Sequence, residues 1–271
     1  MQQEIVIMNM SQIYEQEDFY RHRRFHWIDC TDLSGVNCYC TPEAGQLLRQ
    51  RIAPFGPEGV HFLDSGNYHY ISEFWLEKIA EPFHLVVFDY HSDMQPPLFP
   101  NLLSCGGWVQ QVLDTNAFLQ KVWIVGPEQS SFAAIAQCYR KRLVCISLQQ
   151  LQREATASVL NCLLEDNLPV YVSLDKDVLS RHFARTNWSQ GSLSLDVLEH
   201  LLGPVLQSRR LIGVDICGEC AEGLQMLYQN EDEQINNETN RELLEFCWQA
   251  PKPASENHSD KNGASRCLSV R

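Results

Sequence analysis

The fold is decided by the stretch His84-Leu85-Val86-Val87-Phe88-Asp89-Tyr90-His91-Ser92-Asp93. Its first half is an apolar run of the kind that forms a strand covered on both faces. Its second half, Asp-x-His-x-Asp, sets two carboxylates and an imidazole at alternating positions, so an extended chain would turn all three the same way. Burying such groups without partners is very costly. Because ligands of parallel α/β sheets bind outside the carboxyl ends of the strands, the stretch predicts a metal site at that edge.

Similar apolar runs recur along the chain and alternate with longer helical patterns, which is typical of a parallel sheet flanked by helices. Strands are predicted at residues 4–8, 60–63, 84–88, 121–125, 143–146, 169–174 and 211–216. Helices are predicted at residues 42–52, 72–80, 108–116, 130–139, 148–164 and 194–207. The expected fold class is therefore α/β, with three α-β-α layers around a mostly parallel central sheet.

Two further segments place metal-binding side chains after predicted strands. One is Ser173-Leu174-Asp175-Lys176-Asp177, which adds two carboxylates. The other is a glycine-containing turn after residue 63, which presents His69. With the first stretch, they supply six candidate ligands, namely His69, Asp89, His91, Asp93, Asp175 and Asp177.

Six donors are more than one open catalytic metal needs, so the sequence predicts two divalent metal ions. A set of carboxylate and imidazole donors is suited to borderline-hard ions such as manganese and is unlike the thiolate donors of many zinc sites. Two adjacent ions that share carboxylates can hold a bridging water and lower its pKa toward neutrality. That hydroxide is the reagent for hydrolysis at neutral pH, and Mn²⁺ is the expected cofactor.

These motifs resemble those of the arginase/agmatinase (ureohydrolase) family, which carries Gly-Gly-Asp-His-Ser, Asp-Ala-His-x-Asp and Ser-x-Asp-x-Asp in this order. The resemblance spans residues 60–219 and implies an arginase-like fold. It implies that one manganese is held by His69, Asp89, Asp93 and Asp175, and the other by Asp89, His91, Asp175 and Asp177. Asp89 and Asp175 would then be the bridging carboxylates.

The resemblance also implies two catalytic residues, and the sequence departs from the family pattern at one point. Asp93 would steady the tetrahedral intermediate and the leaving group, and Glu219, one position away from the family's glutamate, would grip the substrate. Arginases carry a proton-shuttling histidine in the loop after the second motif, but residues 101–108 contain none. Either Ser104, Cys105 or a distant residue such as His182 replaces it, or the chain has no shuttle.

The implied activity is hydrolysis of a C–N bond in the guanidino, amidino or formimino group of a small nitrogen-rich substrate. One alternative is an amide hydrolase similar to the histone deacetylases, with a single zinc, although the chain has no adjacent histidine pair. Another is a non-catalytic relative that binds metal and ligand through altered loops. The resemblance also raises the possibility of a homo-oligomer.

The composition limits the kinds of partner that the protein is expected to bind and predicts the cellular compartment. Of the 271 residues, 44% are hydrophobic, which is ample for a large core, and the formal net charge of −13 disfavours nucleic acid. No apolar stretch is long enough to span a membrane. Eleven cysteines without a secretory leader predict reduced thiols and a cytoplasmic location.

The remaining predictions concern the cysteines and the chain end. Cys217-Gly218-Glu219-Cys220 has the spacing of redox and zinc sites, which Cys38 and Cys40 could complete, whereas buried thiols are the commoner case. The loop at residues 33–40 is expected to line the site. A metallohydrolase domain is predicted at residues 1–228, an acidic linker and short helix at 229–250, and a disordered tail at 251–271.

Overall fold

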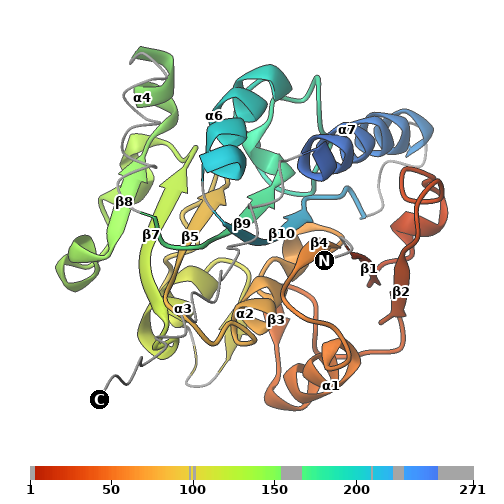
Figure 1. Ribbon diagram of the computed structural model, residues 1–271, viewed down its shortest axis with the longest axis horizontal. Coiled ribbons are helices and arrows are strands. Elements are labelled where there is room, and N and C mark those ends of the chain that lie inside the picture. The colour runs from red at the N-terminus through yellow and green to blue at the C-terminus, as the bar shows by residue number, and fades with distance from the viewer. Residues whose placement is uncertain are drawn as a thin grey trace, which may run out of the picture.

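A computed structural model describes residues 4–97, 99, 102–153, 167–208, 210–221 and 229–249 of the protein. Eight parallel strands form one central sheet (Figure 1). Their spatial order is β2 (His26–Asp29), β1 (Ile5–Asn9), β4 (Gly59–Phe62), β10 (Leu211–Cys217), β9 (Val170–Asp175), β5 (Phe83–Phe88), β7 (Leu119–Val125) and β8 (Leu143–Ile146). A separate antiparallel ribbon pairs β3 (Tyr39–Cys40) with β6 (Leu103–Ser104).

All seven predicted strands are present, and no strand end differs from its prediction by more than two residues. They were readable because strands buried on both faces are continuous apolar runs. The prediction missed β2, which lies at the edge of the sheet. Only Ile28 of its four residues is buried, so this strand has no apolar run to reveal it.

Helices cover both faces of the sheet, as Figure 1 shows. On one face lie α1 (Pro42–Ile52), α2 (Ile71–Leu76) and α3 (Trp108–Thr115), which share an apolar core with the sheet. On the other lie α6 (Leu195–Ser208) and α7 (Gln229–Gln249), with a second core. The three-layer α-β-α prediction is therefore confirmed.

Local signals explain some of the helix boundaries. Helix α1 begins where predicted, because the Thr41 side chain accepts a hydrogen bond from the Ala44 amide and proline fills the first helical position. The helix expected at 130–139 is instead two short 3-10 turns, η3 (Gln129–Phe132) and η4 (Gln137–Lys141). The helix expected at 148–164 begins as α4 (Leu148–Arg153), and its remainder lies outside the described residues.

The prediction of an acidic linker followed by a short helix is wrong, because α7 is one helix of 21 residues. Its buried face begins with Asn236 and Asn240 and continues with Leu243 and Cys247. A packed helix is usually recognised by a stripe of apolar residues along one face. In α7 the first half of the buried face carries asparagine side chains, so the pattern is hidden. The predicted domain boundary at residue 228 and the tail at 251–271 fall on undescribed residues.

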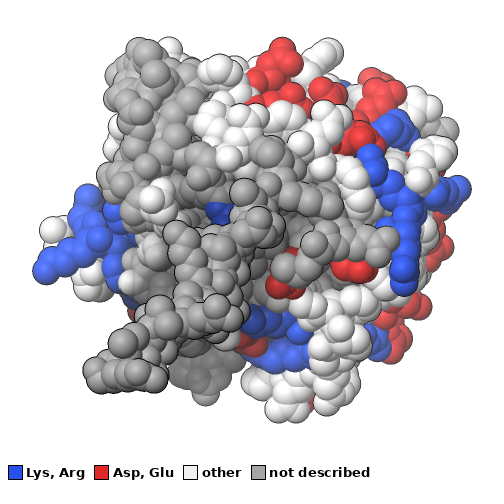
Figure 2. Space-filling model, in the orientation of Figure 1, with Lys and Arg blue, Asp and Glu red and all other residues white. Residues whose placement is uncertain are grey.

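Ion pairs fasten α7 to the N-terminal segment. Arg23 pairs with Glu245 at 2.6 Å, and Arg241 pairs with Asp18 at 2.5 Å. Figure 2 shows acidic and basic side chains intermixed toward its right-hand edge, where α7 approaches the N-terminal strands. In the part of the chain that is described, no helix has the length and apolarity needed to cross a bilayer.

Candidate metal centre

The predicted ligands surround one cavity at the carboxyl ends of four neighbouring central strands, β4, β10, β9 and β5. The cavity has a volume of about 240 Å³. Its wall includes all six predicted ligands, His69, Asp89, His91, Asp93, Asp175 and Asp177. Segments that are far apart in the sequence therefore meet because parallel strands end at the same edge.

The donors form two adjacent groups that share one carboxylate. In the first group, His69 Nδ1 lies 3.2 Å from Asp89 Oδ2 and 3.2 Å from Asp93 Oδ2. In the second, His91 Nδ1 lies 3.5 Å from Asp89 Oδ1 and 2.7 Å from Asp177 Oδ2. The two oxygens of Asp89 thus face different groups, which is the arrangement of a bridging carboxylate.

Asp175, the other predicted bridging residue, lies closer to the first group. Its Oδ2 is 3.7 Å from His69 Nδ1, while its Oδ1 accepts a hydrogen bond from the Asp177 amide at 2.9 Å. Among the described residues, the groups able to hold a metal place Asp175 with His69 and not with His91. The structure therefore shows the bridging geometry for Asp89 only.

A turn, and not an extended chain, brings the residues after β5 together. The strand ends at Phe88, and Asp93 has φ of 49°, in the left-handed region. The alternation argument was thus wrong about the backbone, although it predicted the right convergence. The turn is held by backbone amides, since Asp89 accepts from the His91 amide and Asp177 from the Tyr90 amide.

Hydrogen bonds behind His69 orient its ring. Nε2 lies 2.8 Å from Ser173 Oγ, and Ser173 in turn donates to Asp215 Oδ1 at 2.5 Å. With Ser173 donating to Asp215, its oxygen is free to accept from Nε2–H, which leaves the lone pair of Nδ1 facing the carboxylates. This is the outer-partner arrangement that fixes the tautomer of a metal-binding histidine.

His91 repeats this arrangement, with Nε2 lying 3.0 Å from Ser189 Oγ and Nδ1 turned toward carboxylates. Asp93 is oriented by Trp108, whose indole N–H donates to Asp93 Oδ2 at 2.7 Å. The roles of Trp108 and Ser189 could not be predicted from the sequence, because a partner from another element has no fixed spacing to the ligand. Asp215, by contrast, interrupts an apolar strand and is buried, so its position in the sequence could have indicated a polar partner behind the site.

Acidic groups are concentrated at this site. Asp89, Asp93, Asp175 and Asp177 are all buried. Burial and the neighbouring Asp89 raise the pKa of Asp93 to about 7 and also raise that of Asp175. Burial would likewise raise the pKa of Asp89, but hydrogen bonds from the two histidines, when their Nδ1 atoms are protonated in the absence of metal, lower it.

Burial lowers the pKa of both imidazoles, but the groups around them outweigh it, so that the pKa of His91 is raised to about 12 and that of His69 well above its usual value. As ligands the two rings would give up these protons, and four ionised carboxylates would then carry a charge that two divalent cations neutralise. The donor set, all oxygen and imidazole in these two groups, fits ions such as manganese. The residues present therefore fit the pair of ions that the resemblance implies.

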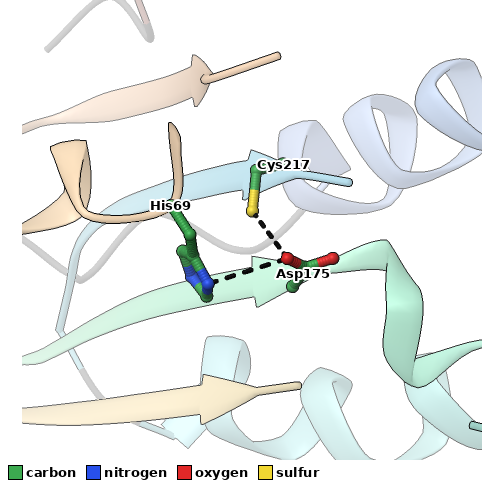
Figure 3. A group of neighbouring side chains, drawn as sticks. All are labelled: His69, Asp175 and Cys217. Atoms are coloured by element: carbon green, nitrogen blue, oxygen red, sulfur yellow. Dashed lines mark hydrogen bonds and ion pairs between the residues drawn. The ribbon is translucent and has the colours of Figure 1, made fainter. Parts of the chain in front are cut away.

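Cys217 stands beside this site and was not among the predicted ligands. Its sulfur lies 3.2 Å from Asp175 Oδ2 in a fully buried position, and Figure 3 shows His69 and Cys217 both directed at the Asp175 carboxylate. The cluster with Cys38, Cys40 and Cys220, which was the less favoured interpretation of the spacing, is not among the donor groups of the described residues. The Cys-x-x-Cys spacing is therefore not a four-thiol site.

Glu219 does not reach the cavity, and the predicted contact with substrate is not supported. It is fully buried, pairs with the ammonium of Lys176 and accepts a hydrogen bond from Asn240 at 2.8 Å. Glycine occupies position 218 with φ of 98°, and a Cβ there would lie 2.5 Å from Asp175 Oδ1. The turn after β10 thus directs Glu219 behind the metal ligands.

The candidate replacements for the shuttle histidine divide into two classes. Ser104 and Cys105 line the cavity, as do Cys38 and Tyr39 from the loop that was expected to reach it. His182 is not among the lining residues and instead packs edge-on against Phe183.

Comparisons with known proteins agree with this geometry. An uncharacterized protein of Thermotoga maritima is 28% identical over 232 residues, which is 86% of each chain. Among solved structures, proclavaminate amidino hydrolase from Streptomyces clavuligerus matches with a TM-score of 0.68 and 14% identity, covering 92% of both chains.

Formiminoglutamase of Trypanosoma cruzi with Mn²⁺ matches with a TM-score of 0.66 and 13% identity, covering 92% of this chain and 94% of that one. At these identities the two structures show the fold. The sequence model of the Arginase family matches residues 5–219, which include every predicted ligand. The chain therefore belongs to the Arginase family.

Proposed function

We propose that the protein is a dinuclear metal hydrolase that cuts a C–N bond in the guanidino, amidino or formimino group of a small molecule. The observation that carries the proposal is the pair of donor groups that share Asp89 at the wall of one cavity. Neighbours of the same fold include an amidino hydrolase and a formiminoglutamase with Mn²⁺, which agrees with this reaction class.

The first ion would be held by His69, Asp89, Asp93 and Asp175, and the second by Asp89, His91, Asp175 and Asp177. When bound, two divalent cations would supply an activated water and polarise the carbon under attack. The oxygen-rich donors favour manganese. Ser173 and Ser189 hold the two imidazoles, so the protein supplies a preorganised set of donors.

Asp93 is the proposed catalytic residue of the chain. It lines the cavity, and Trp108 holds its Oδ2 by a hydrogen bond of 2.7 Å. From this position its carboxylate can steady the positive charge that develops on a leaving amine. The tilted contact between the rings of His69 and Trp108, with centroids 4.9 Å apart, adds to the rigidity of this wall.

A deacetylase-like reaction with one zinc is less well supported. Such chemistry was expected to need a histidine pair as acid and base. The cavity wall contains His69 and His91, and each turns Nδ1 toward carboxylates and Nε2 toward a serine. Both rings therefore act as ligand donors in this geometry, and the two donor groups favour two ions.

The test begins with metal-loaded protein. Protein prepared with manganese is analysed for metal content per chain, and guanidino, amidino and formimino compounds are screened for release of urea, ammonia or amine. Asp175→Asn and Asp93→Ala are the test variants, and Asp114→Asn, at an exposed position, is the matched control.

Two ions per chain with turnover that only the test variants lose would support the proposal. Two ions without turnover on any compound would favour a non-catalytic binding protein, and absence of bound metal would refute the dinuclear site. A cytoplasmic location and homo-oligomerisation stay predictions, which fractionation and light scattering would test.

A further inference from the structure

The position of Cys217 follows from the register of the sheet. Strands β10 and β9 are parallel neighbours, and Cys217 pairs with Asp175 at their carboxyl ends. The thiol is therefore held beside the carboxylate by the backbone hydrogen-bond ladder as well as by side-chain packing. Figure 3 shows the sulfur and the His69 ring approaching Asp175 from two sides.

The spacing of these three donors fits a single ion. Cys217 Sγ lies 3.2 Å and His69 Nδ1 lies 3.7 Å from Asp175 Oδ2. Bonds of about 2.0–2.3 Å from one ion to nitrogen, oxygen and sulfur place neighbouring donors roughly 3–3.8 Å apart. All three side chains are buried, so packing holds the donors in place.

We propose that Cys217 is a ligand of the ion at the His69 position and makes that position select a thiophilic divalent ion, such as zinc, over manganese. The inference rests on the proposed function only for the existence of the two ion positions. Thiolate is a soft donor that favours zinc and related ions, whereas carboxylate favours manganese. The second group, Asp89, His91 and Asp177, contains no sulfur and keeps the manganese preference.

The competing explanation is that Cys217 only donates an S–H hydrogen bond to Asp175. A thiol is a weak donor, and the other Asp175 oxygen already accepts from the Asp177 amide. A hydrogen-bonding thiol and a ligating thiolate differ in one spectroscopic property. Only a thiolate bonded to cobalt gives an intense near-ultraviolet charge-transfer band.

The experiment loads the metal-free full chain with Co²⁺ and records its absorption while the bound metal is counted. We expect the wild type to bind two ions and to show the thiolate-to-cobalt band for one of them. Cys217→Ser should lose the band. Cys38→Ser and Cys105→Ser, which change the two thiols of the cavity wall, should keep it.

The outcomes separate the inference from the proposed function. A band that Cys217→Ser abolishes supports the inference even if no amidine or guanidine is hydrolysed. Two bound cobalt ions without a band, or a band that survives in Cys217→Ser, overturns it, whatever the turnover. Failure to bind cobalt overturns both proposals.

A competition experiment measures the selectivity itself. When zinc is added to manganese-loaded protein, one of the two manganese ions should be displaced, and the electron paramagnetic resonance signal should report the remaining one. Cys217→Ser should weaken zinc binding by more than the roughly 10–100-fold that loss of an outer hydrogen-bond partner costs. Equal displacement of both ions in the wild type would contradict the assignment.

Discussion

Two buried acidic clusters lie on either side of the loop that follows β9, and they are neutralised differently. In front, Asp89, Asp93, Asp175 and Asp177 face two imidazoles at the cavity. Behind, Glu17 and Glu219 meet Lys176 and Asn240. Lys176 itself stands between two of the front carboxylates in the sequence, yet its ammonium bonds only to the rear cluster among the contacts described.

The rear cluster contains its own cation. Lys176 is fully buried and pairs with Glu219, while Asn240 from α7 donates to both Glu17 and Glu219. Burial and the charge of Glu219 raise the pKa of Glu17 well above its usual value, which favours the neutral form of that carboxyl. One lysine and one glutamate then leave no net charge to compensate.

The front cluster has no lysine or arginine among the residues that line its cavity, and only two imidazoles oppose its four carboxylates. This excess of acidic groups is the reason to expect ions there. Helix α7 belongs to the rear cluster although it lies beyond the residues that the family model matches. The comparison teaches that a buried acidic cluster indicates a metal only when the protein does not neutralise it itself. The predictions that follow alter one cluster at a time.

The largest effect is expected from Asp89→Asn, since Asp89 is the carboxylate that both donor groups share. We expect loss of both ions and a fall in turnover beyond the roughly 10²–10³-fold that loss of a single stabilising donor costs. Metal content and steady-state rates measure the two effects. Asp114→Asn serves as the control, and retention of two ions by Asp89→Asn would contradict the shared-ligand assignment.

Lys176→Met should break the rear cluster by leaving Glu219 buried without a counter-charge. Loss of one partner of a buried ion pair destabilises a protein by about 3–5 kcal/mol. Urea unfolding would measure the loss, with exposed Lys141→Met as the control. Adding Glu219→Gln to Lys176→Met should restore most of the stability, and failure to do so would show that the charge of Lys176 is not what the cluster needs.

The pH dependence of metal-free protein should expose the front cluster. The pKa of Asp93 is about 7 in the folded state, against 3.8 when unperturbed. A raised folded-state pKa gives stability that is complete below the unfolded pKa and is lost as pH rises through the folded one. As the pH rises from about 4 to about 7, Asp93 should therefore lower the free energy of unfolding of the metal-free protein by on the order of a few kcal/mol.

Asp175 and Asp177, whose pKa values are also raised by burial and neighbouring aspartates, act in the same direction. Bound cations stabilise the ionised carboxylates, so metal-loaded protein should not show this loss. Urea unfolding at pH 5 and pH 7, with and without a chelator, measures the difference. Parallel pH profiles for the two forms would show that the front cluster is not a cation site.

The smallest effect is expected from Trp108→Phe, which keeps an aromatic ring but removes the hydrogen bond to Asp93. Loss of such an outer partner weakens metal binding by about 10–100-fold. Trp75→Phe is the matched control, because Trp75 is also fully buried and its indole nitrogen has no hydrogen-bond partner among the described residues. Equal metal affinities in the two variants would show that Trp108 does not support the metal ligands.

The sequence predicted the parallel sheet and the six candidate ligands because both depend on local pattern. Strands such as β5 and β9 are continuous apolar runs, and Asp-x-His-x-Asp or Asp-x-Asp directly after them is visible without a structure. It did not predict α7, whose buried face begins with Asn236 and Asn240. Amides on a buried face are readable only when their partners are known.

By itself, then, the sequence determined the fold class, the family and which side chains gather at the strand ends, since these follow from hydrophobic periodicity and motif order. Only the tertiary structure decided that Asp89 faces both donor groups, that Glu219 turns away to Lys176, and that Cys217 stands beside Asp175. The physical reason is that strand register and turn geometry set these directions. Register is a relation between distant segments, and neither segment encodes it alone.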